Sequence, residues 1–173
     1  EIMPSLVGSE MCIRDSVTVV ADVGQNQIWT CTEYKFRKEG RLLTSGGMGT
    51  MGYSVPAAIG AKMADNSRAT VAICGDGAFQ MSFMELATAV QFGVDIKVVV
   101  MTNNRLGMVR ELQTNGYHDR QTAVFLDGSP DFIKLAEAYG IPAMRVYDDD
   151  TMEKGVELSL IHISEPTRLG MIS

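Results

Sequence analysis

The sequence predicts an α/β fold, namely a doubly wound, mainly parallel sheet with helices on both faces. Three near-continuous apolar runs of strand length support this, at residues 17–22 (VTVVAD), 69–74 (ATVAIC) and 96–102 (IKVVVMT). Such runs suit the strands of a parallel sheet, which are buried on both faces. Helical patterns separate the runs, as crossover connections between parallel strands require.

Two helices are expected between these strands. Residues 53–64 form the first, after the short apolar run RLLTSG that starts at residue 41. Residues 79–93 form the second, and five apolar residues fall on one stripe of that helix. These are Phe79, Phe83, Leu86, Ala87 and Val90.

A third helix and a last strand are expected near the C-terminal end. The helix opens with Ser129 as its N-cap and Pro130 at its first position, and it closes on Gly140. These residue types are preferred at those positions because of their side-chain acceptor, fixed φ and tolerance of positive φ, respectively. The strand-like run AMRVY follows at residues 143–147.

Composition is that of a globular domain and excludes several functions. The 173 residues suit one domain, with 46% hydrophobic and 21% charged residues. A net charge of −6 disfavours a nucleic-acid partner. No apolar run approaches the roughly 20 residues of a membrane span, and no secretory signal precedes the domain. Three irregularly spaced cysteines fit a reducing cytosol, so we expect a cytoplasmic protein without membrane contact.

The two ends of the chain differ from its middle. Residues 1–16 and 158–173 show neither helical nor strand periodicity, and both resemble translated sequencing-adapter read-through. We interpret them as non-native tails and place the domain at residues 17–157. Cys12 and His162 therefore drop out as candidate site residues, and His118 is interpreted as a loop histidine.

Polar residues follow each of the three long strands, where ligands of such a sheet bind. The first strand leads into Gly24, Gln25 and Asn26, whose amide groups are uncharged donors suited to an anion. An ordinary polar loop would look the same. The third strand leads into Asn103 and Asn104, whose side-chain oxygens are suitable ligands for a hard cation.

The second strand ends in Asp76 between two glycines, with a helix directly after it. Glycines let a bulky anion approach the backbone, and a helix N-terminus contributes positive partial charge. A carboxylate would repel a phosphate unless a cation lay between them, so the pattern predicts Mg²⁺ bound by carboxylate and phosphate oxygens. A tight Asp-Gly turn is the alternative interpretation.

Residues 47–52 read GMGTMG and match the G-x-G-x-x-G fingerprint of a dinucleotide-binding turn. A nicotinamide-binding Rossmann domain is therefore an alternative. However, a ribose-binding acid would need neither flanking glycines nor an Asn-Asn pair at the next strand end. The metal–diphosphate interpretation accounts for all three motifs, and we prefer it.

Several longer stretches resemble the cofactor-binding C-terminal domain of acetolactate synthase catalytic subunits, which use thiamine diphosphate. The resemblance covers essentially all of residues 17–157. Its stretches are DVGQNQIW, TSGGMGTMGYSVPAAIGA, GDGAFQMSFMELATAVQFG, NNRLGMVRELQ and PDFIKLAEAYGI. It implies the thiamine diphosphate-binding fold for this domain.

The resemblance also implies residue roles. Mg²⁺ would be held by the side chains of Asp76 and Asn103 and by the backbone carbonyl of Arg105, with Asn104 as an alternative ligand because relatives usually carry Asn where Thr102 stands. Met51 would be the apolar wedge between the two cofactor rings, and the Gly49 carbonyl would accept a hydrogen bond from the cofactor's amino group. The diphosphate would contact Gly24, Gln25, Asn26, Gly77, Ala78, Gly107 and Met108.

The implied activity is the joining of pyruvate to a second 2-oxo acid with loss of CO₂, giving acetolactate or acetohydroxybutyrate for branched-chain amino acid biosynthesis. The family works as a homodimer or tetramer, and its biosynthetic members add FAD and a regulatory small subunit. Its activating glutamate lies in a separate N-terminal domain, so we expect this fragment to be inactive alone. Pyruvate oxidase, glyoxylate carboligase, a 2-oxo acid decarboxylase and a non-catalytic binding module remain alternatives.

Overall fold

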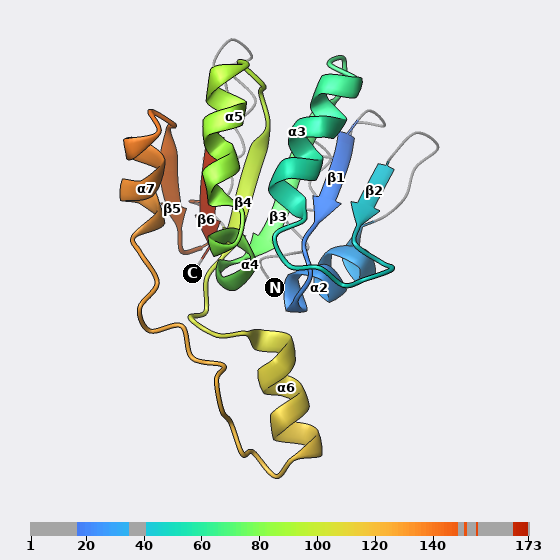
Figure 1. Cartoon of the computed structure of the whole chain (residues 1–173), viewed down its shortest axis with the longest axis vertical. Helices are drawn as coiled ribbons and strands as arrows, with labels where there is room; N and C mark the ends of the chain where they lie inside the picture. The colour runs from blue at the N-terminus through green and yellow to red at the C-terminus, as the bar shows by residue number, and fades with distance from the viewer. Residues whose placement is uncertain (1–16, 35–40, 149–150, 152–154, 156–167, 173) are drawn as a thin grey trace.

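The chain forms a six-stranded sheet in which every neighbouring pair of strands is parallel (Figure 1). The computed structural model describes residues 17–34, 41–148, 151, 155 and 168–172. The sheet order is β2-β1-β3-β4-β6-β5. The strands are β1 (Val17–Ala21), β2 (Arg41–Thr44), β3 (Ala69–Gly75), β4 (Lys97–Met101), β5 (Ala143–Val146) and β6 (Arg168–Ile172).

The winding direction of the sheet changes between β1 and β3. From β1 the chain first adds β2 on one side, then returns to add β3 and β4 on the other. The carboxyl ends of the two strands at such a switch point diverge into different connections and leave a crevice for a ligand. The strand-end residues after 21 and 75 therefore lie where a ligand site is expected.

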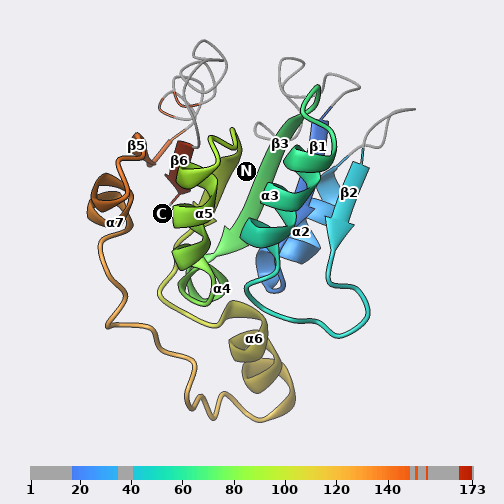
Figure 2. The same ribbon diagram turned by 45° about the horizontal axis from the view of Figure 1, so that its top comes forward.

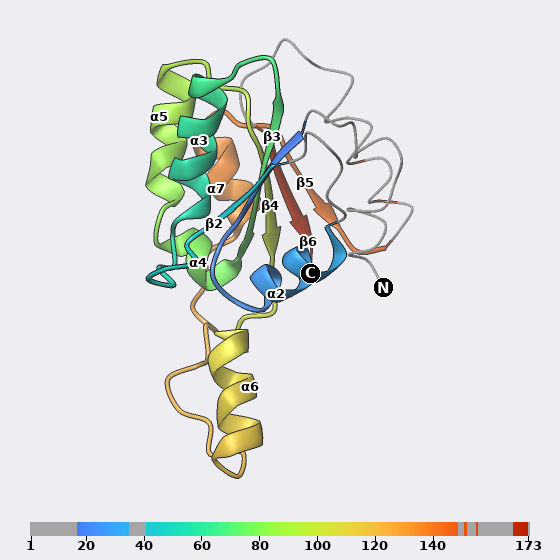
Figure 3. The same cartoon turned by 90° about the vertical axis from the view of Figure 1, so that its right-hand side faces the viewer.

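Helices cover both faces of the sheet, unequally within the described residues (Figure 3). α3, α5 and α7 pack on one face, while α2 lies on the other. The helices are α2 (Gln25–Glu33), α3 (Ser54–Ala64), α4 (Asp76–Gln80), the 3₁₀ helix η1 (Phe83–Glu85), α5 (Leu86–Gln91), α6 (Gly107–Gly116) and α7 (Phe132–Ala138). This arrangement confirms the expected doubly wound α/β fold.

The core follows from the two-sided burial of the central strands. Val20, Ala72 and Val98 point to the helix-rich face and join a large buried cluster with Phe79 and Leu86. The opposite face carries a smaller cluster around Val19, Tyr34 and Ile73. Alternate residues of one strand thus enter different apolar layers, which explains the near-continuous apolar runs in the sequence.

The expected helix over residues 79–93 is wrong as a single element. The chain forms α4, η1 and α5, and at Ser82 the backbone leaves the helical region with φ −141°. The break lies where the chain meets Gly52: a Cβ built on Gly52 would lie 3.0 Å from the Met81 Cβ. Beyond the break, Leu86 and Ala89 are buried, so Val90 is exposed despite its place on the predicted stripe.

The start of α7 also differs from the expectation. Its N-cap is Asp131, whose Oδ1 accepts hydrogen bonds from the backbone N–H groups of Ile133 and Lys134. The predicted cap at Ser129 is thus two residues early. The C-terminal prediction is confirmed, because Gly140 has φ +70° and the Ile141 N–H donates to the Ala136 carbonyl in a Schellman arrangement.

β6 comes from the segment 158–173, which we excluded from the fold. Residues 168–172 pair in parallel with β4 on one side and β5 on the other. A strand in this position satisfies backbone groups that would otherwise leave two open sheet edges. The omission of this strand is a correction to the predicted fold, whereas the non-native origin of the tails stays a prediction.

α6 lies outside the main body of the domain and projects beyond the carboxyl ends of the strands (Figure 2). A short antiparallel stem closes this excursion: the Leu106 N–H donates to the Val124 carbonyl, and the Leu126 N–H donates to the Asn104 carbonyl. α6 buries none of its residues. Across the described residues, no helix combines the length and apolar character needed to cross a bilayer.

Candidate functional site: a cleft at the switch point

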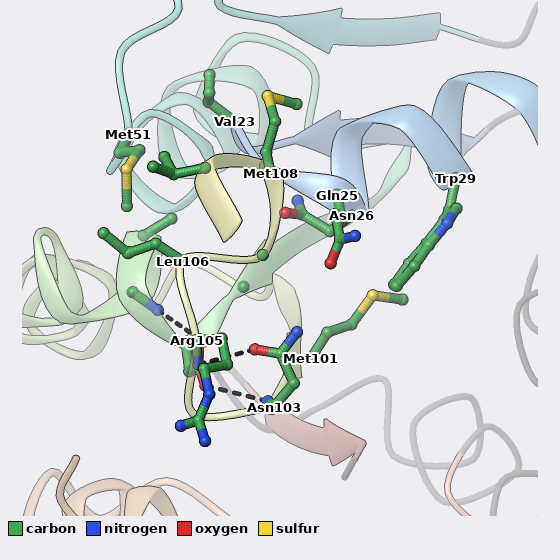
Figure 4. Close-up of a pocket in the computed structure, with 17 residues that line it drawn as sticks. Val23, Gln25, Asn26, Trp29, Met51, Met101, Asn103, Arg105, Leu106 and Met108 are labelled. Atoms are coloured by element: carbon green, nitrogen blue, oxygen red, sulfur yellow. Dashed lines mark hydrogen bonds between the residues drawn. The ribbon is translucent and has the colours of Figure 1, made fainter. Parts of the chain in front are cut away.

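A cleft with a cavity volume of about 100 Å³ opens at the carboxyl ends of β1, β3 and β4. The lining comes from all three strand ends and one further loop (Figure 4). It comprises residues 23–26, 29, 51, 75–78, 101, 103 and 105–109. The structure therefore brings together the three motifs that the sequence places far apart.

Three helices begin at this cleft. α2 starts at Gln25, α4 at Asp76 and α6 at Gly107, and the first residues of each line the cleft. None of the three N-cap residues uses its side chain to cap its helix. Helix N-termini carry partial positive charge and backbone donors without intrahelical acceptors. Their convergence makes the cleft favourable for an anion with several oxygen atoms.

Asp76 lies at the centre of this arrangement and is only 1% exposed. Gly75 pairs with Met101 in the parallel register, so Asp76 emerges beside the segment that leaves β4. Its Oδ2 accepts hydrogen bonds from the backbone N–H groups of Asn103 (3.1 Å) and Asn104 (2.6 Å). Its Oδ1 accepts from the N–H of Gly77 at 2.8 Å. The carboxylate thus joins the two loops that were expected to share a cation.

Burial raises the pKa of Asp76, and the three backbone hydrogen bonds oppose that rise. The folded protein therefore disfavours the charged carboxylate when no cation is near. A bound divalent cation would stabilise that charge. Within the described residues no three His, Cys, Asp or Glu side chains gather into a metal site, so a cation here would depend on neutral oxygens as well.

The two asparagines after β4 have separate structural roles. The Asn103 side chain lines the cleft, and its Oδ1 accepts a hydrogen bond from the Arg105 N–H at 2.9 Å (Figure 4). Asn104 has φ +53°, a left-handed conformation that asparagine tolerates better than most residues. Asn104 does not line the cleft. This geometry favours Asn103 over Asn104 as a metal ligand.

The backbone of Arg105 faces the cleft, whereas its guanidinium contacts other residues. It stands opposite Phe125 in the stem, between the two stem hydrogen bonds, so its own N–H and C=O point away from the returning segment. Its guanidinium lies 4.4 Å from the centroid of the Phe125 ring and 3.1 Å from the Asp127 carboxylate. The cleft therefore contains no cationic side chain directed at a bound anion.

Glycines are required where the lining is tightest. Gly24 has φ +144°, and a Cβ there would lie 2.6 Å from the Asn26 Oδ1. A Cβ on Gly77 would lie 2.7 Å from the Leu106 Cδ2, and one on Gly107 would overlap the Gln25 Oε1. Side chains at these positions would displace the walls of the cleft.

Gln25 and Asn26 line the cleft as expected, but their hydrogen bonds alter the expected roles. Both Asn26 amide hydrogens are used, by the carbonyls of Asp22 (2.9 Å) and Ile73 (3.2 Å). Asn26 therefore links the segments that end β1 and β3, and its contact with a diphosphate stays a prediction. Gln25 donates to the Glu111 carboxylate of α6 at 3.0 Å.

The segment GMGTMG lies between β2 and α3 and contributes only Met51 to the cleft. A Cβ built on Gly77 would lie 3.4 Å from the Met51 Cε, so this side chain reaches the Asp76 loop. Gly49 has φ +62°, is exposed and does not line the cleft. Its role as a hydrogen-bond acceptor stays a prediction, and the glycines of this segment form no dinucleotide site in the cleft.

Sequence reasoning missed two contributions to the site. Leu106 packs beside Gly77, and its local sequence gave no indication that it would form the wall facing Met51. Asp22 directly follows β1 and is fully buried, although it does not line the cleft. An acidic residue directly after an apolar strand was the available signal, and Asp76 shares that position.

The sequence profile described as thiamine pyrophosphate enzyme, C-terminal TPP binding domain, matches residues 22–167. The chain is 43% identical to the acetolactate synthase large subunit of Lactococcus lactis over 148 residues, which cover 86% of this chain and 25% of that protein. It is 40% identical to the mitochondrial acetolactate synthase catalytic subunit of Aspergillus candidus over 167 residues, covering 95% and 24%.

A probable acetolactate synthase large subunit of Methanocaldococcus jannaschii is 40% identical over 154 residues, covering 89% of this chain and 26% of that protein. The chain thus spans about a quarter of the length of these curated relatives. The profile match continues to residue 167, beyond residue 157, where the sequence analysis placed the end of the domain.

Proposed function

The chain belongs to the thiamine pyrophosphate enzyme family, whose C-terminal cofactor-binding domain it matches, and on this premise we propose that its cleft binds thiamine diphosphate through Mg²⁺. We further propose that the parent protein is an acetolactate synthase catalytic subunit. The relatives carry that name, and their similarity extends over most of this chain.

One observation carries the cofactor proposal: three helix N-termini and a single buried carboxylate meet in one cleft. The helix ends favour a polyanion, whereas the Asp76 carboxylate repels one. A divalent cation between the carboxylate and the anion removes this conflict. Mg²⁺ suits the position because it prefers oxygen ligands and binds with substrate phosphates.

The residues present fit this group. Asp76, the amide oxygen of Asn103 and the carbonyl of Arg105 would hold Mg²⁺ together with oxygens of the diphosphate. Backbone amides at the starts of α2, α4 and α6 would bind the remaining phosphate oxygens. The glycines at 24, 77 and 107 leave the space that such an anion needs.

The chain's own residues would position and shield the cofactor. Met51 and Leu106 form an apolar wall beside Gly77, and we propose that they contact the rings and set their mutual orientation. When bound, thiamine diphosphate supplies an electron sink for decarboxylating a 2-oxo acid and transferring the remaining two-carbon unit. With pyruvate as donor and pyruvate or 2-oxobutyrate as acceptor, the products would be acetolactate or acetohydroxybutyrate.

The parent would need more than this domain for catalysis. The relatives are about four times as long as the matched segment. We propose that a further domain, contributed by a partner subunit of a dimer or tetramer, supplies the activating glutamate. We also propose a cytoplasmic enzyme of branched-chain amino acid biosynthesis, with FAD and a regulatory small subunit.

Calorimetry on the 173-residue chain tests the cofactor proposal. We expect thiamine diphosphate to bind in the presence of Mg²⁺ and to be released by EDTA. Trp29 is the single tryptophan and lines the cleft, so its fluorescence should change on binding. Binding of NADH together with failure to bind thiamine diphosphate would replace this proposal by the nicotinamide alternative.

The activity proposal requires the parent protein. Supplied with pyruvate, 2-oxobutyrate and glyoxylate in competition, it should form acetolactate or acetohydroxybutyrate. Release of acetaldehyde, oxygen-dependent formation of acetyl phosphate, or condensation of glyoxylate would instead assign it to a decarboxylase, a pyruvate oxidase or a glyoxylate carboligase, respectively.

A further inference from the structure

The fully buried carboxylate of Asp22 lies outside the cleft, and no step of the proposed function uses it. Its Oδ1 accepts hydrogen bonds from the backbone N–H groups of Val23 (2.8 Å) and Gly52 (3.0 Å). Its Oδ2 accepts from the Ser54 N–H at 2.7 Å. Burying a charge is costly unless it is compensated, and here backbone donors provide that compensation.

One of the three donors, the Ser54 N–H, belongs to the first residue of α3, and another, the Gly52 N–H, lies just before the helix. Tyr53 is the N-cap of that helix and contributes no side-chain hydrogen bond. The Asp22 carboxylate therefore takes the role of a capping group although it comes from the end of β1. It satisfies one helix donor that lacks an intrahelical acceptor, the Ser54 N–H, and the helix N-terminus stabilises its charge.

The same contacts fix one end of the segment that carries Met51. Residues 46–50 are exposed, and the other end is held by Ser45, which accepts hydrogen bonds from the N–H groups of Gly49 and Thr50. Gly52 has φ +85° and follows Met51 directly. Its N–H, bonded to Asp22, therefore fixes the backbone directly after the residue that forms the cleft wall.

We propose that Asp22 is a positioning residue that sets how far Met51 reaches into the cleft. It acts through the backbone of Gly52 and touches neither cation nor diphosphate. The inference rests on the proposed function, because it assigns Met51 to the cofactor rings. It follows that loss of the Asp22 contacts should impair recognition of the rings and spare recognition of the diphosphate.

Two ligands separate these effects: Mg²⁺ with thiamine diphosphate, and Mg²⁺ with inorganic pyrophosphate, which has no rings. Dissociation constants are measured for both with the wild-type chain and Asp22→Asn. We expect Asp22→Asn to weaken thiamine diphosphate binding about tenfold and pyrophosphate binding less than about twofold. Met51→Ala should show the same selectivity, and the double variant should match Met51→Ala to within about twofold, because both changes act on one contact.

Gly52→Ala provides a second route if Asp22→Asn does not fold. It retains the carboxylate, but the positive φ disfavours a side chain and the new Cβ would lie 3.0 Å from the Met81 Cβ. It should show the same selective loss. Equal weakening of both ligands, or no weakening of either, would overturn the role of Asp22. A wild-type chain that binds both ligands equally would also overturn it while leaving the diphosphate site intact. Binding of neither ligand would overturn the proposed function itself.

Discussion

Asp22 and Asp76 follow neighbouring parallel strands, and both are buried carboxylates with three backbone N–H partners. They differ in the origin of those partners. Asp22 receives two from Gly52 and Ser54, in the segment that leads into α3 outside the cleft, whereas Asp76 receives two from the loop after β4, which borders the cleft. The same residue type at equivalent strand ends can thus anchor a segment or face a ligand, depending on which element approaches it.

The largest expected difference between the two is in metal-dependent binding. Asp76→Ala should weaken binding of thiamine diphosphate with Mg²⁺ by at least about a hundredfold, because it removes the only carboxylate of the proposed site. Calorimetry at fixed Mg²⁺ measures this. Asp119→Asn, at an exposed turn after α6, is the matched control and should bind normally. Retention of Mg²⁺-dependent binding by Asp76→Ala would contradict the assignment.

The effects on the free energy of unfolding should be in the opposite order, with the larger loss on substitution of Asp22. Asp22→Asn should lower the free energy of unfolding by about 2 kcal/mol, because buried backbone donors lose a charged acceptor. Asp76→Asn should change it by less than about 1 kcal/mol, since the raised pKa of Asp76 means that its ionisation already costs folding energy at neutral pH. Urea denaturation of the metal-free chain measures both. Equal losses would remove the distinction between the two sites.

The pH dependence of binding should follow Asp76. Because its pKa is raised in the folded protein, the carboxylate takes up a proton at a higher pH than an ordinary aspartate. Only the ionised form binds Mg²⁺ well, so affinity should be constant above this pKa and fall by about tenfold per pH unit below it. A series of titrations across the acidic range measures the inflection. An inflection at the ordinary pKa of an aspartate would show that burial does not determine the pKa of Asp76.

The smallest expected effect concerns the residue that links the two strand ends. Asn26→Ala removes the donor shared by the carbonyls of Asp22 and Ile73 and should cost about 1 kcal/mol of stability. Since no amide hydrogen of Asn26 remains for a phosphate, binding should weaken by less than about threefold. A much larger loss of pyrophosphate affinity would show that the side chain turns toward the anion when it binds.

The fold and the strand-end loops that line the cleft were largely predictable because their signals are local. Apolar runs gave β1, β3 and β4, and the Gly-Asp-Gly sequence placed Asp76 beside a helix start. The break at Ser82, the stem around Arg105 and the contacts of Asp22 depend on segments 20 or more residues away. Periodicity within one segment carries no information on such contacts.

The predictions for the N-cap of α7 and for strand β6 were wrong for other reasons. Ser129 and Asp131 are both residue types that favour the N-cap position. Asp131 is the N-cap because its side chain accepts hydrogen bonds from two backbone N–H groups. β6 was excluded because its segment resembled foreign sequence, yet a five-residue extended segment suffices to pair between β4 and β5. Backbone pairing requires little from side chains.

The stem between residues 104–106 and 124–126 has a consequence for how such a domain can change over evolutionary time. The chain departs from and rejoins the body at one place, so α6 and its turn can be lengthened, shortened or exchanged while the sheet keeps its shape. One end of that excursion nevertheless carries Gly107 and Met108 into the cleft. Sequence changes in α6 and its turn are therefore unconstrained far from the sheet and constrained next to the cleft.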